Sequence, residues 1–390
     1  MTLPPRRIPL AWRNLSESGW RLLASVAGTA FAVVLMLLQN GFRDALLDNM
    51  SALIAHLDGD LFVTNRMRYM LSHPAPITRR RLSQALEVPG VASASPFYIN
   101  AEQARWRHPA TGIDRLIRVV ACAPGDDVLD IPAVRARRAD WSRPDSALAD
   151  ERSKPALYGP LRIGTVSELQ GRRIEVVGLF RLGTDFRSNG TLLLSERNML
   201  AYDPGRRGGS WGETAIDVGV LRISPGADLG QVRARLEARL PPDVAVLTKR
   251  GFILKEQRFW ENVAPLGVVF NIGLVMGFLV GLAICYQVLF SEISDRIGEF
   301  ATLKAMGYRD RDLIRIVVEE SVYLALLGFA AGVAASAQLF RWIQGVTGLN
   351  MTLKPLGAAA ILGLTLVMCV LAGGLAARRL LTVDPAELYS

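Results

Sequence analysis

The chain has 390 residues, half of them hydrophobic, and carries a formal net charge of +9. Four stretches of 18, 27, 20 and 23 residues contain no charged side chain, which argues against a soluble protein, because soluble core helices show polar residues at regular intervals. A helix rises about 1.5 Å per residue and the hydrocarbon core of a bilayer is about 30 Å thick, so each stretch predicts a membrane span. The stretches are Leu22–Gln39, Ala264–Phe290, Ser321–Phe340 and Pro355–Ala377.

The residues before the first stretch predict an amphipathic helix. Ile8, Ala11 and Leu15 recur at helical spacing with arginines off their stripe, as in helices that lie in a membrane interface. The first stretch could instead be a cleaved signal peptide with residues 30–32 as its processing site. Its apolar run continues beyond that site to Leu38, which favours an uncleaved anchor.

Between the first two spans the periodicity of the sequence predicts a large α+β domain. Strands are expected at residues 59–64, 116–122, 172–180, 191–194 and 216–223, and helices at residues 79–86, 228–240 and 255–262. Residues 126–154 are rich in Asp, Arg, Ala and Pro without a period, and predict an irregular insertion; the structure of 126–170 stays open. We expect the domain to have two lobes.

Small residues recur at helical spacing in the second and third spans. Such ridges let helix backbones approach closely, either within one chain or between two copies. The residues are Gly273, Gly277 and Gly281 in the second span and Gly328, Gly332 and Ser336 in the third.

The segment between the second and third spans predicts a helix with one apolar side. Ile293, Ile297, Phe300 and Lys304 fall at i, i+4, i+7 and i+11, and Gly307 ends the pattern. A solvated helix is the simpler interpretation. Apolar side chains on a short helix outside the membrane nevertheless need a partner surface, and a cognate protein is the economical one.

Basic residues beside the spans predict the orientation of the chain. Arg6, Arg7, Arg13 and Arg21 precede the first span and Arg378 and Arg379 follow the last, so both ends of the sequence are expected in the cytoplasm. The expected segments are an amphipathic helix (1–21), span one (22–39), an extracytoplasmic domain (40–262), span two (263–290), a cytoplasmic helix (291–315), span three (316–340), a periplasmic loop (341–354), span four (355–377) and a cytoplasmic tail (378–390).

The positive charge could suggest nucleic acid as a partner. Runs such as residues 79–81 and 135–138 lie in the domain expected outside the cytoplasm, so a solvated face, or contact with anionic lipid headgroups, is the better interpretation, and no nucleic acid is expected. Of three cysteines, Cys122 lies in this domain and Cys285 and Cys369 lie in spans. This distribution gives the domain no disulfide framework and no metal spacing.

The sequence predicts no catalytic residue, cofactor site or metal site. The phosphate-binding pattern GxxxxGK[ST] is absent. Residues 208–212 fit the nucleophile pattern G-x-S-x-G around Ser210, but that pattern needs a following helix and a later histidine. All three histidines precede Ser210 and a strand is expected after it, so a glycine-rich turn is the better interpretation.

The segment between spans two and three resembles a known family. Arg296-x-x-Glu299-Phe-Ala-Thr-Leu-Lys-Ala-Met-Gly-Tyr308, with Glu320 opening the next span, is similar to the signature of FtsX/MacB-type ABC transporter permeases, and residues 384–387 resemble their terminal DPAE. Within this superfamily the chain most resembles DevC-type permeases. The residues that carry this narrower resemblance are 11–15, 28–36, 41–45, 59–62, 79–86 and 276–281.

The resemblance implies a MacB-like fold of one plus three spans with the domain after the first span. It also implies a homodimer in the bacterial inner membrane, working with a separate ABC ATPase that binds the ATP. An HlyD-like adaptor and a TolC-like outer-membrane duct would complete an export system, with membrane lipids as surroundings. The residues expected to contact the ATPase are Ile293, Arg296, Ile297, Glu299, Phe300, Ala301, Leu303, Lys304, Ala305, Met306 and Gly307.

Two other functions stay open within the same family. An FtsX-like protein would control a cell-wall hydrolase without transport, and a LolC/LolE-like protein would release lipoproteins. A membrane-anchored serine hydrolase is a third class, which would require a reactive Ser210. The sequence does not identify the exported compound.

Overall fold

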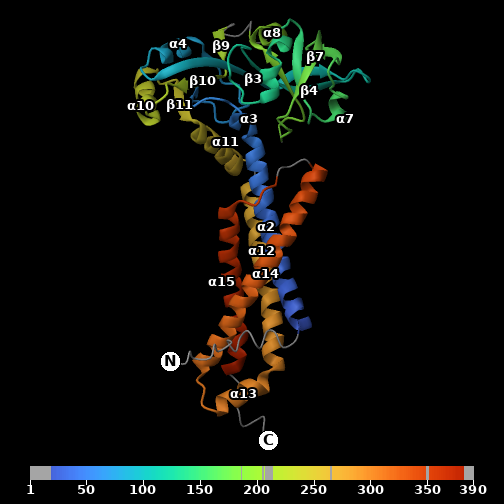
Figure 1. Cartoon of the computed structure of the whole chain (residues 1–390), viewed down its shortest axis with the longest axis vertical. Coiled ribbons are helices and arrows are strands. Elements are labelled where there is room, and N and C mark those ends of the chain that lie inside the picture. The colour runs from blue at the N-terminus through green and yellow to red at the C-terminus, as the bar shows by residue number, and fades with distance from the viewer. Residues whose placement is uncertain are drawn as a thin grey trace, which may run out of the picture. The chain divides into compact units, whose positions relative to one another are not determined.

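The computed structural model describes residues 19–185, 187–203, 206, 214–263, 266–347 and 351–381 (Figure 1). The chain divides into two compact units, a helical unit of residues 1–45 and 265–390 and an inserted domain of residues 46–264. The amphipathic pattern before residue 19, the Ser210 motif and residues 384–387 lie outside the described residues.

Four long helices make up most of the helical unit. They are α2 (Gly19–Met50), whose last turn belongs to the inserted domain, α12 (Leu266–Asp295), α14 (Asp310–Thr347) and α15 (Pro355–Leu381). In the part of the chain that the structure describes, these four helices are long and apolar enough to cross a membrane. The expected arrangement of one plus three spans, with a domain of helices and strands between the first and second, is confirmed.

Three buried hydroxyl groups in the helical unit are satisfied by their own helices. Thr29, Ser321 and Thr365 are fully buried, and each donates a hydrogen bond to the carbonyl oxygen four residues earlier, at 3.1, 2.8 and 2.8 Å. A lone polar group in hydrocarbon costs several kcal/mol. Each of these bonds stays within one helix, so none of the three hydroxyl groups is left unsatisfied where the helices pack. Helix α15 packs against both α12 and α14.

A nine-stranded mixed sheet forms the inserted domain, and six of its strands close into a ring. The order is β11-β1-β10-β3-β4-β8-β5-β7-β6, and β6 also pairs with β3 through Leu169 and Trp106. The first part of β3 therefore pairs with β10 and its last part with β6. The strands are β1 (Leu61–Asn65), β3 (Val91–Arg107), β4 (Asp114–Cys122), β5 (Ser146–Asp150), β6 (Val166–Leu169), β7 (Arg172–Phe180), β8 (Thr191–Ser195), β10 (Val218–Ile223) and β11 (Val244–Thr248), and a separate pair is β2 (Ile77–Thr78) with β9 (Ala215–Ile216).

Short helices cover the sheet, as Figure 1 shows. Side-chain caps begin two of them, with Ser195 accepting from the backbone N–H of Asn198 and Asp228 accepting from that of Gln231. The helices are α3 (Ala52–Ala55), α4 (Arg80–Leu86), α5 (Pro132–Ala136), α6 (Arg138–Trp141), α7 (Pro155–Tyr158), α8 (Glu196–Tyr202), α10 (Leu229–Arg239) and α11 (Lys249–Val263).

Alternating side chains of the central strands build two cores, one on each face of the sheet. In β5, Ala147 and Ala149 belong to the core that contains Trp106, whereas Leu148 belongs to the core that contains Phe62. This follows from the period of two along a strand. Both faces are covered, so β5 and β8 are buried along their whole length.

The strands and helices expected from periodicity are found, with shifted ends. The expected strand at 216–223 is divided into β9 and β10 by Asp217. The buried carboxylate of Asp217 accepts hydrogen bonds from Arg68 Nη2 at 2.7 Å and from the Ile99 backbone N–H at 2.9 Å. The polar side chain is thus held inside the domain, where it interrupts the strand.

Two expectations for the domain are wrong. Residues 126–154 are no irregular insertion, because they form α5, α6 and the fully buried strand β5. The sequence of β5 (SALAD) shows no clear alternation of apolar and polar side chains, because it is mostly small residues and ends in the buried Asp150. The domain also has one continuous nine-stranded sheet in place of two lobes. Strand β3 was missed because it contains Pro96, which pairs opposite Gly219 in the sheet interior, whereas proline normally marks an edge.

We expect Leu148→Ala to lower the free energy of unfolding by about 2–5 kcal/mol, because Leu148 is fully buried in β5 and its loss leaves a cavity. Leu116→Ala is the matched control. Leu116 is 56% exposed in β4, so its replacement should change stability by less than about 0.5 kcal/mol. Thermal unfolding of the full chain in detergent, followed by tryptophan fluorescence, measures both. Equal stability of the two variants would contradict the buried position of β5.

Candidate coupling sites

The segment between spans two and three consists of two helices instead of the one continuous helix expected. Helix α12 continues to Asp295, and α13 (Ile297–Ala305) begins after a break at Arg296, whose φ is −104° and ψ 15°. Ile293 therefore lies on α12, Arg296 lies at the break, and the other expected contact residues lie on α13 and in the turn after it.

The apolar side of this segment is already covered within the chain. Ile293, Phe300 and Ala301 are 2%, 6% and 3% exposed, and they pack in one cluster with Leu313 and Val317 of α14. These three side chains therefore need no partner protein to cover them, contrary to the expectation from the sequence. They bind α13 to the end of the helical unit.

The opposite side of α13 is exposed. Met306 and Tyr308 are 64% and 45% exposed, and Glu299 and Thr302 also face solvent. We call Gly298, Glu299, Thr302, Met306 and Tyr308 the coupling face. Ile297, Leu303, Lys304 and Arg296 are half-buried at its margin.

Gly307 ends α13 in a left-handed turn. Its φ is 95°, and the Tyr308 N–H donates to the Leu303 carbonyl at 3.2 Å while the Gly307 N–H donates to the Lys304 carbonyl at 3.1 Å. This pair of bonds is the Schellman motif, which favours glycine because it has no Cβ. The motif turns the chain so that Tyr308 stands beside the coupling face.

Both glycine ridges lie against α2. A Cβ added at each glycine would meet a side chain of α2 at between 2.5 and 3.3 Å, closer than ordinary van der Waals contact. The facing pairs are Gly273 with Gln39, Gly277 with Met36, Gly281 with Ala32, Gly328 with Thr29 and Gly332 with Val33. These glycines therefore pack within one chain, with α2 held between α12 and α14.

We expect Gly332→Ala to lower the stability of the helical unit. Its Cβ would lie 2.6 Å from Val33 Cγ1 and 3.1 Å from the Ala30 carbonyl oxygen, and such overpacking costs about 1–3 kcal/mol. Gly363→Ala is the control, because nothing lies within 4 Å of its Cβ position and alanine favours a helix by up to about 1 kcal/mol. Unfolding of both variants in SDS measures the difference. A Gly332→Ala variant as stable as the control would contradict the close contact.

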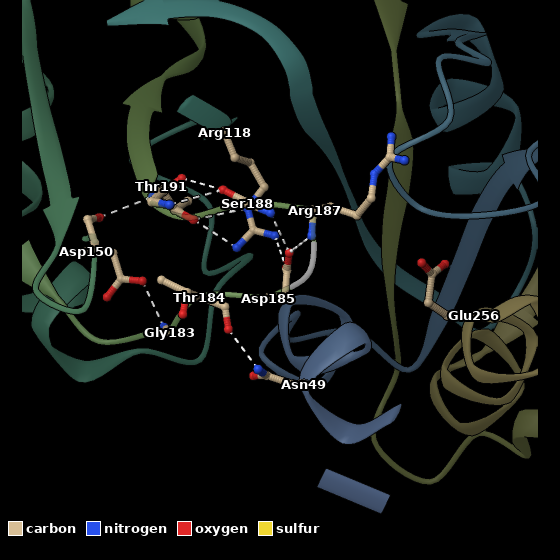
Figure 2. Close-up of polar contacts among 12 residues, drawn as sticks. Asn49, Arg118, Asp150, Gly183, Thr184, Asp185, Arg187, Ser188, Thr191 and Glu256 are labelled. Carbon is tan, nitrogen blue, oxygen red and sulfur yellow. Dashed lines mark hydrogen bonds and ion pairs between the residues drawn. The ribbon is translucent and has the colours of Figure 1, made fainter. Parts of the chain in front are cut away.

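A polar cluster in the inserted domain joins the last turn of α2 to the sheet. Figure 2 shows Asn49 Nδ2 donating to the carbonyl oxygen of Thr184 at 2.7 Å. The adjacent Asp185 forms a buried ion pair with Arg118 of β4 and accepts from the Ser188 N–H at 2.8 Å. We call Asn49, Arg118, Thr184, Asp185 and Glu256 the junction.

Asp150 holds the same loop from the other side. Its carboxylate is completely buried and accepts from the N–H groups of Leu182 at 3.2 Å and Gly183 at 2.8 Å (Figure 2). The loop is therefore fixed to β4 and β5, the two strands that carry Arg118 and Asp150. A displacement of Asn49 acts directly on this loop.

Glu256 of α11 completes the junction. Its side chain accepts from the Leu71 N–H at 2.7 Å and from Trp260 Nε1 at 3.1 Å. Burial raises the pKa of Glu256, and these hydrogen bonds and Arg68 oppose that shift. Gln257 on the same helix donates to Ser51 Oγ at 3.3 Å, so α11 is also tied to the residues that follow α2.

Sequence reasoning did not find the junction, because its members are far apart in the chain and share no spacing. Arg118, Asp185 and Glu256 are among the residues that line a cavity of about 20 Å³, which has room for about one water molecule. Among the described residues, no group of three or more His, Cys, Asp or Glu side chains could hold a metal ion. The cavity at the junction therefore leaves little room for a ligand.

Two family models match the chain in succession. The MacB-like periplasmic core domain matches residues 22–239, and the FtsX-like permease C-terminal matches residues 271–385. The first match covers α2 and most of the inserted domain, and the second covers most of α12 together with α13, α14 and α15.

Solved structures similar to part of this chain include two from bacteria. The periplasmic region of MacB from Actinobacillus actinomycetemcomitans is 12% identical, with a TM-score of 0.36 and coverage of 53% of this chain and 94% of that one. The extracellular domain of the noncanonic ABC-type transporter YknZ from Gram-positive bacteria is 15% identical, with a TM-score of 0.34 and coverage of 49% and 99%. No curated protein sequence matches significantly.

Proposed function

Because the chain belongs to the FtsX/MacB superfamily of ABC transporter permeases, we propose that it transmits the motion of a separate ABC ATPase to its inserted domain. This proposal rests on the two sides of α13. One side is buried against α14 and the other is exposed. A partner that moves the coupling face would move the helical unit with it.

The proposed direction of transmission runs from α13 through the spans to the junction. Helix α12 ends at the start of α13, and α2 is held between α12 and α14 by the glycine contacts. The last turn of α2 carries Asn49, which is bonded to the loop of Thr184 in the inserted domain. The inserted domain would then act on an HlyD-like adaptor and a TolC-like duct in tripartite export, with two copies of the chain per assembly.

The coupling face is tested by Glu299→Arg. Glu299 is exposed, so the variant should insert and accumulate normally, while a reversed charge at a contact with the ATPase costs several kcal/mol. We expect loss of permease-stimulated ATP hydrolysis and of ATPase co-purification. Met306→Ala, which removes an exposed apolar side chain, should weaken both. Phe300 is unsuitable for this test because it is buried, and a charge there would destabilise the helical unit.

Glu237→Arg provides the matched control for Glu299→Arg. Glu237 lies on α10 of the inserted domain and pairs with Arg233 at 2.9 Å on an exposed surface, a contact worth roughly 0.3–0.5 kcal/mol. Stimulated hydrolysis should remain normal in this control. Normal hydrolysis in Glu299→Arg and Met306→Ala, at normal abundance, would place the ATPase contact elsewhere.

We also propose that the inserted domain is extracytoplasmic and that α13 is cytoplasmic, in the inner membrane of a bacterium. Exposed basic residues beside the spans support this orientation, with Arg309, Arg315 and Arg378 at the end that carries α13. A phosphatase reporter that is active only outside the cytoplasm should be active when inserted at Gly112, in the turn between β3 and β4. The same reporter fused after Tyr308 should be silent. The reverse pattern would overturn the orientation.

Co-purification identifies the role within the family. An HlyD-like adaptor among the bound proteins supports export. Co-purification of a peptidoglycan hydrolase or a coiled-coil regulator would instead support the FtsX-like role. Co-purification of lipoproteins would instead support the LolC/LolE-like role. The pure chain is expected to hydrolyse no ATP, since ATP belongs to the partner subunit in this family.

A further inference from the structure

Two cysteines from different helices meet in the core of the helical unit. Cys285 lies on α12 and Cys369 on α15, 84 positions apart, and their Sγ atoms are 3.8 Å from each other. Both side chains are buried, at 1% and 0% exposure. We propose that this pair is a redox site, at which a reversible disulfide joins α12 to α15.

The surroundings let the two helices approach closely. On α15, Ala372 and Ala376 are completely buried in the same cluster as both cysteines. On α12, one turn before Cys285, a Cβ at Gly281 would meet Met368, the residue next to Cys369. Small side chains thus bring the helix backbones together at the level of the thiols.

The thiols have few polar neighbours. Thr29 Oγ1 of α2 lies 3.5 Å from Cys285 Sγ, and the same hydroxyl group donates to the Ser25 carbonyl at 3.1 Å. Among the contacts that the structure describes, Cys285 Sγ touches Cys369 Sγ on α15. The pair is held in contact by packing.

Disulfide formation requires the two sulfur atoms to approach from 3.8 Å to about 2.0 Å. Each thiol gives up one proton and one electron, and an S–S bond forms. A two-electron acceptor of the quinone class, dissolved in the bilayer, takes both protons and both electrons and leaves as the hydroquinone. The thiols are buried, so the acceptor reaches them only through motion of the surrounding helices, and the rate of oxidation follows that motion.

The third cysteine does not compete. Cys122 lies in β4 of the inserted domain, is 2% exposed, and burial raises the pKa of its thiol to about 12. An intramolecular disulfide needs a second thiol within reach, and among the contacts of the described residues Cys122 has no cysteine partner. Oxidation should therefore be confined to the pair in the helical unit.

The link would fix the helix that leads into α13. Helix α12 ends at Asp295, and only Arg296 separates it from the start of α13 at Ile297. With α12 joined covalently to α15, a movement between these two helices is blocked, so the oxidised chain should respond less to the ATPase. This consequence rests on the proposed function, whereas formation of the link does not.

Counting free thiols tests the link without any ATPase. Membranes containing the full chain are treated with diamide, a two-electron oxidant whose azo group takes up the two hydrogens, then unfolded in SDS and labelled with polyethylene glycol maleimide. The three cysteines of the chain should give three labels before oxidation and one label after it. Dithiothreitol should restore three.

Variants that each lack one of the three cysteines identify the bond. Cys122→Ser should fall from two labels to none, and Cys369→Ser should keep two labels before and after diamide. Three labels in the oxidised wild-type chain would overturn the proposal, and so would a dimer band that accounts for the lost labels. The two serine variants report independently, so poor folding of Cys369→Ser leaves the Cys122→Ser result decisive.

Permease-stimulated ATP hydrolysis is the second readout. In a preparation with the partner ATPase, diamide should lower stimulation in Cys122→Ser, dithiothreitol should restore it, and Cys369→Ser should be insensitive. Loss of free thiols without any change in stimulated hydrolysis would support the disulfide but overturn its proposed effect on coupling. Thiol counts that never change, with normal stimulation, would overturn the link and leave the proposed function intact.

Discussion

Backbone hydrogen bonding in hydrocarbon is the constraint on which the helical unit depends. With no water to satisfy N–H and C=O groups, the spans must be helices, and even side-chain hydroxyls such as those of Thr29 and Ser321 bond to their own backbone. Association of these helices then cannot rely on the hydrophobic effect, because lipid is as apolar as leucine. Close contact through glycine, as between Gly332 and Val33, supplies the van der Waals packing instead.

The inserted domain depends on a different structural feature. One long strand, β3, is shared between two parts of the sheet. Strand β3 pairs with β10 in its first part and with β6 in its last, so it belongs both to the closed ring and to the open extension. Core residues on both faces make this sheet one rigid body. The polar loop of Thr184 and Asp185 is fixed to that body by Arg118 and Asp150.

Helix α13 gives the family assignment a physical content. Phe300 and Ala301 pack on α14, so α13 cannot move freely, while Glu299 and Met306 point to solvent. The proposed transmission of motion rests on this arrangement, in which one side of α13 is attached and the other is exposed. The break at Arg296 and the Schellman turn at Gly307 set its length, and both are local features that need no partner.

The sequence by itself determined the spans, the place of the inserted domain and the family, because charge-free runs and the motif around Glu299 are local patterns. Strands with alternating residues, such as β7, were also predictable. Only the tertiary structure decided that β5 is buried, that Phe300 is covered by α14, and that Asn49, Arg118 and Asp185 meet. The physical reason is that burial and polar contacts between distant segments depend on which elements pack together, and periodicity along one segment does not encode its partner.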